Sequence, residues 1–269
     1  MVGEAYRTIV ATGETWRVKA FHSDDVEIAY IDEGEGQPIL LIHGFASNVQ
    51  TNWVTTGWVG FLRGKGYRVI ALDNRGHGRS QKLYSLSDYS APLMAMDALR
   101  LLDHLRIARA HVMGYSMGAR ITAFLALANP ERVRSAIFGG LGINMVRGMA
   151  GTGPIAAALE AASIDEVTNQ TARTFRAFAE QTNSDLKALA ACIRSSRDPL
   201  SREDVARITC PVLVAVGETD VVGGAAEALA ELIPGARGVT IPGRDHMKAV
   251  GDRFYKEAVA TFLADLGEA

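Results

Sequence analysis

The chain has 269 residues, enough for one large α/β domain or two small ones. With 48% hydrophobic and 22% charged residues, it has the composition of an ordinary globular protein that can bury a sizeable core without disulfides or metal ions. The net charge of −2 comes without any basic cluster, which argues against nucleic acid or an anionic membrane surface as a partner.

The ends and cysteines of the chain indicate a cytoplasmic protein. The N-terminal segment lacks the apolar core of a signal peptide, and no apolar run approaches the ~20 residues of a membrane-spanning helix. The spacing of Cys192 and Cys210 does not argue for a disulfide, so we expect two reduced, buried thiols. No Cys/His cluster has metal-site spacing, and we expect no cofactor.

The first elements predicted along the chain are the two strands of an antiparallel hairpin. Two runs with rough alternation of apolar and polar residues lie within residues 16–31, separated by the turn-rich segment His22–Asp25. A glycine-rich loop at residues 33–36 leads into a short, continuously apolar run at 38–42, typical of a strand buried on both faces.

Strands and helices then alternate. Further strands are predicted at residues 67–72, 110–113, 133–138, 211–216 and 237–241, and helices through 53–62 and at 88–106, 117–128, 224–233 and 251–266. Together with the hairpin, this order predicts a mostly parallel eight-stranded sheet with helices on both faces.

Residues 141–205 interrupt this alternation. The segment begins with irregular, glycine-rich sequence and continues with alanine-rich helical stretches that contain no strand-like run. We therefore predict a core domain formed by residues 1–140 and 206–269, with 141–205 as a helical cap over the edge of the sheet. Because methionine adapts to pockets of varied shape, Met113, Met145 and Met149 are candidates to line an apolar pocket.

Polar side chains with catalytic potential follow several of the predicted strands. Ser116 lies in the sequence Gly-Tyr-Ser-Met-Gly directly after the strand at 110–113. Asp220 and His246 follow the last two predicted strands. The carboxyl ends of parallel strands meet at one edge of a sheet, so we expect a hydroxyl, an acid and an imidazole to gather there.

The chain resembles members of the α/β-hydrolase fold superfamily, in particular serine hydrolases of the carboxylesterase or lipase type. The segments that carry the resemblance are HGF at 43–45, DNRGHGRS at 73–80, GYSMG at 114–118, GETD at 217–220 and GRDH at 243–246. They occur in the family's order over nearly the full length of the chain.

The resemblance implies a role for each motif residue. Ser116 would be the nucleophile, His246 the general base that activates it, and Asp220 the acid that orients the imidazole. Glu218 is the alternative acid, since Asp245 adjoins His246 and points away from it. The backbone N–H groups of Phe45 and Met117 would form the oxyanion hole. The resemblance also implies that His43 shapes the oxyanion loop and that Arg75 and His77 are structural.

These residues predict a serine hydrolase that cleaves small to medium-sized, largely apolar carboxylic esters through an acyl-enzyme. Related reactions on the same triad stay open: hydrolysis of thioesters, lactones or carbon–carbon bonds, and cofactor-free perhydrolysis. A non-catalytic binding or signalling protein on the same scaffold is a further alternative. The natural substrate and the oligomeric state cannot be read from the sequence.

Overall fold

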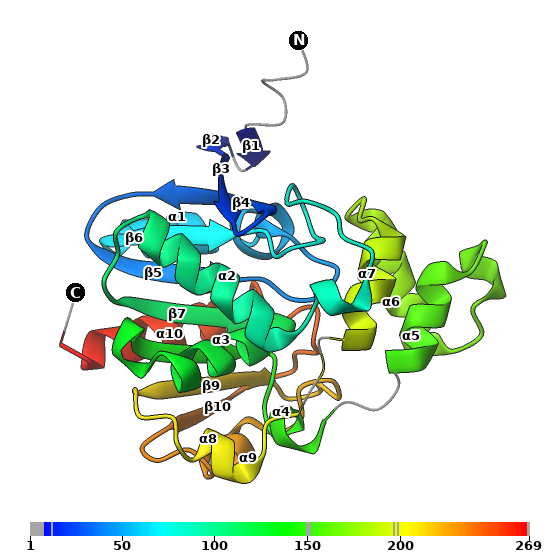
Figure 1. Cartoon of the computed structure of the whole chain (residues 1–269). Helices are drawn as coiled ribbons and strands as arrows, with labels where there is room; N and C mark the ends of the chain where they lie inside the picture. The colour runs from blue at the N-terminus through cyan, green and yellow to red at the C-terminus, as the bar shows by residue number, and fades with distance from the viewer. Residues whose placement is uncertain (1–7, 12, 149–151, 196, 198, 268–269) are drawn as a thin grey trace.

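The computed structural model of the chain describes residues 8–11, 13–148, 152–195, 197 and 199–267. In this part of the chain, eight strands form one sheet in the order β10-β9-β8-β7-β5-β6-β4-β3 (Figure 1). They are β3 (Lys19–Ser23), β4 (Val26–Glu33), β5 (Gln37–Ile42), β6 (Tyr67–Leu72), β7 (Ala110–Tyr115), β8 (Val133–Gly139), β9 (Val212–Gly217) and β10 (Arg237–Ile241).

The sheet is mostly parallel. Strands β5 to β10 all run in one direction, whereas β4 pairs antiparallel with β6 and β3 pairs antiparallel with β4. The predicted eight-stranded sheet and the α/β-hydrolase fold are therefore confirmed. Neighbouring parallel strands place their carboxyl ends at the same edge, and this edge carries the candidate site.

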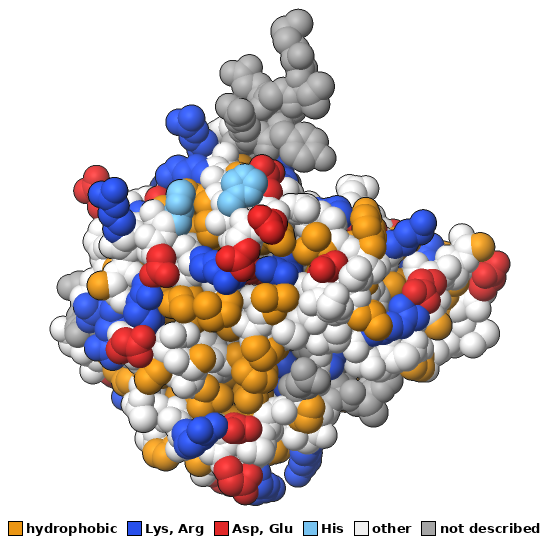
Figure 2. All heavy atoms as spheres, viewed as in Figure 1, with side chains coloured by type: hydrophobic (Ala, Val, Ile, Leu, Met, Phe, Trp, Pro, Cys, Tyr) orange, Lys and Arg blue, Asp and Glu red, His pale blue; other side chains and the backbone are white. Residues whose placement is uncertain are grey.

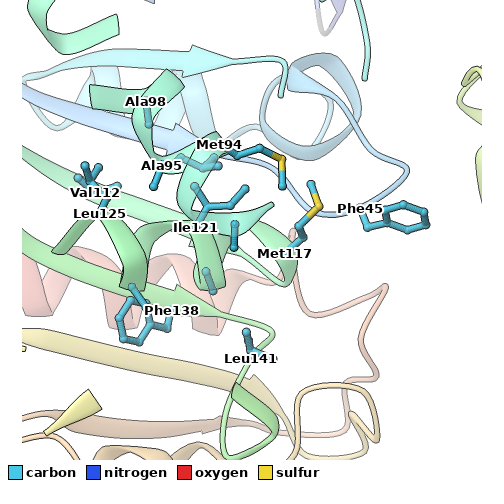
Figure 3. Close-up of a cluster of buried hydrophobic side chains, with 14 of the residues drawn as sticks. Phe45, Met94, Ala95, Ala98, Val112, Met117, Ile121, Leu125, Phe138 and Leu141 are labelled. Atoms are coloured by element: carbon cyan, nitrogen blue, oxygen red, sulfur yellow. The ribbon is translucent and has the colours of Figure 1, made fainter. Parts of the chain in front are cut away.

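Helices cover both faces of the sheet, as predicted. Long helices α2 (Ala91–His104) and α3 (Met117–Ala128) pack on one face, and α1 (Trp58–Gly64) and α10 (Arg253–Asp265) pack on the other. Alternate residues of each central strand enter the two cores: Val112 of β7 packs with α2 and α3, and Met113 packs with α1 and α10. Figure 3 shows the first of these cores, in which Met94 of α2, Ile121 of α3 and Phe138 of β8 belong to one cluster of buried side chains.

The predicted N-terminal hairpin is only partly right. Strands β3 and β4 pair as expected, but the run beginning at Trp16 is divided between two sheets. Its first part, β2 (Glu14–Arg17), pairs with β1 (Thr8–Ala11) in a separate two-stranded sheet. This arrangement buries the Trp16 ring in the core beside α1, where the Arg63 guanidinium lies 5.0 Å from the ring centroid.

The predicted helices differ from the observed ones mainly at their ends. Helix α2 begins at residue 91, later than predicted, because Ser90 caps it by accepting a hydrogen bond from the N–H of Leu93. A short 3₁₀-helix, η3 (Leu86–Asp88), precedes it. Met96, which the apolar spacing places on the buried side, is 37% exposed, and Met94 and Ala95 are buried instead. Helix α9 (Ala226–Ala230) is shorter than predicted.

Between β8 and β9, the described residues contain helices and no strand. They are α4 (Asn144–Arg147), α5 (Thr152–Glu160), η5 (Ile164–Glu166), α6 (Gln170–Gln181), α7 (Leu186–Ser195) and α8 (Arg202–Val205). Helices α5, α6 and α7 gather beyond one end of the sheet (Figure 1). Cys192 of α7 contacts Met117, with 3.9 Å between the two sulfur atoms, so this group of helices rests directly on the start of α3.

Both cysteines are buried, as the sequence predicts, and no disulfide links them. Within the described ranges, no helix combines the length and the apolar character needed to cross a membrane. On the face seen in Figure 2, basic and acidic side chains are interspersed rather than separated into patches.

Candidate active site

Ser116 lies on a sharp turn between β7 and α3. Its backbone has φ 55° and ψ −111°, a strained conformation for a residue with a side chain. The two flanking glycines permit this turn: a Cβ on Gly114 would collide with the backbone of Gly118, and a Cβ on Gly118 would collide with the carbonyl of Ile42 in β5. The absence of side chains at Gly114 and Gly118 therefore allows the sharp turn that Ser116 occupies.

The structure brings Ser116, His246 and Asp220 together in one hydrogen-bonded chain. The Ser116 hydroxyl lies 3.0 Å from Nε2 of His246, and Nδ1 of His246 lies 2.8 Å from Oδ2 of Asp220. Because the carboxylate can only accept, the imidazole proton belongs on Nδ1, which leaves Nε2 free to accept from the serine. The Asp220 side chain is fully buried and that of His246 is 12% exposed.

Backbone donors fix the orientation of the Asp220 carboxylate. Its Oδ1 accepts hydrogen bonds from the N–H groups of Val222 (2.9 Å) and Gly223 (2.8 Å), so Oδ2 is left for His246. Glu218, the alternative acid, instead accepts from the N–H of Gly243 at 2.7 Å and does not reach the imidazole. The geometry thus selects Asp220 as the partner of His246.

Tyr115, the residue before the serine, holds the histidine loop. Its hydroxyl donates to the backbone carbonyl of His246 at 2.7 Å, and the two rings lie 5.6 Å apart. Burial raises the pKa of the Tyr115 hydroxyl well above its ordinary value, so the group remains a donor. The turn at residues 114–118, the elbow, therefore positions the imidazole through two contacts, one from Tyr115 and one from Ser116.

The loop after β5 runs directly against the elbow. A Cβ on Gly44 would lie 3.4 Å from Cβ of Ser116 and 3.2 Å from the carbonyl oxygen of Tyr115. In the described part of the chain, the backbone N–H groups of Phe45 and Met117 have no acceptor. Two unused donors beside a serine hydroxyl are what an oxyanion hole requires.

Several side chains hold this loop in place. Asn52 accepts from the N–H of Gly44 through Oδ1 at 3.1 Å, and Thr182 at the end of α6 donates to the carbonyl of Ala46 at 2.9 Å. His43 donates to the carbonyl of Gly44 at 2.7 Å and accepts from the N–H of Asn74 at 2.9 Å. These contacts agree with the expectation that His43 shapes the loop.

Most residues of the segment 73–80 are buried, and ion pairs and hydrogen bonds hold the segment in place. Arg75 forms an ion pair with Asp97 at 2.7 Å, with both side chains almost fully enclosed. Burial lowers the pKa of His43 to about 4 and that of His77 to about 3, so both imidazoles are neutral. Among the described residues, neither Arg75 nor His77 forms a hydrogen bond with Ser116, in keeping with the structural roles expected for both.

A cavity of about 190 Å³ opens beside Ser116. Its wall has an apolar part and a polar part; the lining residues are Gly44, Phe45, Ser47, Thr51, Asn52, Thr56, Tyr115, Ser116, Phe175, Phe178, His246, Met247 and Val250. A second cavity of about 160 Å³ shares His246, Phe175, Phe178 and Met247 with the first.

The methionines predicted to line a pocket do not line these cavities. Met113 and Met145 are fully buried in the two cores, and Met149 lies outside the described residues. The apolar wall comes instead from Phe175 and Phe178 of α6 and from Met247. A signal for the phenylalanines was present, because they are spaced i, i+3 in an otherwise polar helix.

No group of three or more metal-ligating side chains occurs among the residues that the structure describes. The chemistry that this arrangement supports on its own is nucleophilic: a serine activated by an imidazole, an acid that orients the imidazole, and two N–H donors for a developing oxyanion.

Comparison with known proteins supports the fold described above. Residues 37–150 match the model of the alpha/beta hydrolase fold family. A curated relative from Pseudomonas putida, 2-hydroxy-6-oxononadienedioate/2-hydroxy-6-oxononatrienedioate hydrolase 2, is 34% identical over 125 residues, which are 44% of this chain and 41% of the relative. The chain thus spans about two-fifths of the length of this relative.

Solved structures extend the similarity over nearly the whole chain. Est816, described as an N-acyl homoserine lactone degrading enzyme, is 27% identical, with a TM-score of 0.71 over 91% of this chain and 100% of its own. A bromoperoxidase from Bacillus anthracis has a TM-score of 0.77 at 22% identity, covering 92% of this chain and 100% of its own, and shows likeness of fold.

Proposed function

Because this chain is a member of the α/β-hydrolase fold superfamily, we propose that it is a serine hydrolase that cleaves carboxylic esters through an acyl-enzyme. The observation that carries the proposal is the hydrogen-bonded chain from Ser116 through His246 to Asp220, next to a cavity that a small ester can enter. The preferred esters are small to medium-sized and largely apolar, since Phe175, Phe178 and Met247 form much of the wall.

The reaction follows from the contacts. The Ser116 oxygen attacks the ester carbonyl carbon while its proton moves to Nε2 of His246, and the carbonyl oxygen gains negative charge between the N–H groups of Phe45 and Met117. The tetrahedral intermediate collapses, the carbon–oxygen bond breaks, and the imidazolium returns the proton to the leaving alkoxide. Water repeats the sequence on the acyl-enzyme and releases the acid.

We further propose that residues 141–205 act as the cap of this site. Helix α6 supports this role, because Phe175 and Phe178 line the cavity and Thr182 holds the oxyanion loop. A cap of this kind shapes the substrate pocket and excludes water from the acyl-enzyme.

Lactone hydrolysis is the second candidate, because Est816 is similar over 91% of this chain. A lactone is an internal ester, so it would use the same attack and the same oxyanion hole. Carbon–carbon bond hydrolysis has weaker support, because the relatives named as 2-hydroxy-6-oxononadienedioate hydrolases match at most 50% of this chain. Thioester hydrolysis and perhydrolysis stay as further activities of the same triad.

Labelling with a fluorophosphonate probe tests the proposal. Wild-type protein should be labelled at Ser116 and should hydrolyse p-nitrophenyl esters and lactones, whereas Ser116→Ala should lose both labelling and turnover and keep the fold. Absence of labelling in folded wild-type protein would contradict a serine nucleophile and would favour a non-catalytic binding protein.

A further inference from the structure

The cavity beside Ser116 has one polar wall that the attack on an ester does not use. It is built from the segment that runs from the oxyanion loop through the π-helix η2 (Gln50–Val54). Ser47, Thr51, Asn52 and Thr56 all line the cavity. A plain hydrocarbon chain offers these groups no partner.

The helical turns of this segment place some of these polar residues on one face. The N–H of Asn52 donates to the carbonyl of Asn48, an i, i+4 bond, and the N–H of Thr55 donates to the carbonyl of Gln50, an i, i+5 bond. Residues four or five apart therefore lie one above the other on the same face. Thr51 and Asn52 have these spacings to Thr56, whereas Ser47 precedes the helical turns and joins the group by lining the same cavity. Wide π-turns of this kind are frequent at functional sites.

Two of the four side chains are already engaged. Thr56 donates its hydroxyl to the carbonyl of Asn52 at 2.6 Å, and Asn52 uses Oδ1 to hold Gly44. The Nδ2 group of Asn52 is buried and has no hydrogen-bond partner among the described residues, so only the Oδ1 end of this side chain is engaged. Asn52 and Thr56 thus stabilise the wall and the oxyanion loop.

The hydroxyls of Ser47 and Thr51 are different. Neither has a hydrogen-bond partner in the part of the chain that the structure describes, although Ser47 is only 4% exposed. A hydroxyl can donate one hydrogen bond and accept two, so an enclosed one gains from a partner inside the cavity. The apolar side chains that line the same cavity, among them Phe175, Phe178 and Val250, offer only apolar contact.

We propose that Ser47 and Thr51 form a hydrogen-bonding subsite for esters or lactones whose acyl chain carries a second oxygen function, a keto or hydroxyl group. The inference rests on the proposed function, because it assigns a substrate class to the same site. The apolar wall receives the carbon skeleton, and the polar wall fixes which face of the acyl chain turns toward Ser47.

The test compares methyl hexanoate with its 3-oxo, 4-oxo and 5-oxo derivatives. Wild-type kcat/KM should favour at least one oxo ester over methyl hexanoate by about three- to tenfold, the value of one neutral hydrogen bond. In Thr51→Val, which preserves shape, and in the double variant Ser47→Ala/Thr51→Val, this ratio should fall toward one. Val250→Ala, which changes an apolar lining residue of the same cavity, is the matched control and should retain the ratio.

Two results would overturn the subsite: equal kcat/KM for all four esters in the wild type, or a preference that survives in the double variant. If no ester is hydrolysed, the proposed function fails separately. Calorimetric binding of the four esters to Ser116→Ala, with and without Thr51→Val, then tests the subsite alone. Equal affinities for oxo and unsubstituted esters in the Ser116→Ala background would refute it.

Discussion

Replacing Asp220 with asparagine should trap His246 in the tautomer that cannot activate Ser116. The amide oxygen of the new residue would keep the two hydrogen bonds from Val222 and Gly223, because rotating the amide would place its NH₂ group against two N–H donors. Leaving such buried groups unpaired costs about 1–3 kcal/mol each. The NH₂ group would therefore face Nδ1 of His246 and force its proton onto Nε2.

The expected loss follows from this wrong tautomer. With a proton on Nε2, the imidazole cannot accept the hydroxyl proton across the 3.0 Å contact to Ser116. The equivalent change in a serine protease lowers kcat by about 10⁴, which corresponds to roughly 5.5 kcal/mol of transition-state stabilisation. We expect a loss of this order here, with the fold intact.

The assay is kcat/KM for a p-nitrophenyl ester, together with the rate of fluorophosphonate labelling. Glu218→Gln serves as the matched control, since Glu218 lies in the same loop but bonds to Gly243. It should retain activity within a few-fold of the wild type. If Asp220→Asn kept activity within tenfold of the wild type and Glu218→Gln lost it, the assignment of the acid would be wrong.

Three other predictions address the elbow, the buried histidines and the pocket. Gly118→Ala should prevent the elbow from forming and abolish soluble expression or labelling, whereas Gly64→Ala, whose Cβ meets nothing within 4 Å, should keep the fold and the activity. Because the pKa of buried His77 and of His43 is lowered to about 3 and about 4, the unfolded chain binds more protons than the folded one below pH ~6.5. The free energy of unfolding, measured with urea, should thus be highest above pH ~6.5 and fall by several kcal/mol toward pH 4. In His77→Gln the fall should be less steep, and an equal slope in that variant would contradict this prediction. Phe178→Ala should join the two cavities that this ring lines and raise the kcat/KM ratio of octanoate to butyrate p-nitrophenyl esters about tenfold or more, and an unchanged ratio would place the acyl chain elsewhere.

The sequence predicts the sheet well because buried parallel strands are recognisable in it as short apolar runs. A strand covered on both faces is mostly apolar, as β5 and β7 are apart from Gln37 and His111, and such runs are easy to recognise. Helix α3 is predicted at its observed bounds because its ends have local causes: the glycine turn at Ser116 and Asn129-Pro130. Local chemistry thus decides these elements.

Tertiary contacts decide what the sequence leaves open. The division of the first run into β2 and β3 depends on where Trp16 finds a partner, which lies about 40 residues away on α1. The exposed position of Met96 likewise depends on how α2 rotates against the sheet. Neither is written in the periodicity of the segment itself.

The candidate site shows the same separation. The motif residues could be placed because each follows a strand whose end must lie at one edge of the sheet. The pocket wall could not, because Phe175 and Phe178 reach Ser116 only through the fold of the helical insertion. The π-helical turn that carries Thr51 is equally unpredictable from the sequence, since it depends on one i, i+5 hydrogen bond between Thr55 and Gln50.

The hydroxyl of Tyr115 has a consequence for how the site tolerates thermal motion. Adjacent residues of the elbow hold both the side chain and the backbone of His246, so a shift of the elbow carries the imidazole with it. The distance between the Ser116 hydroxyl and the His246 imidazole then changes little when the sheet undergoes small movements. Tyr115→Phe should consequently leave the geometry intact at low temperature and make turnover fall earlier on heating than global unfolding does.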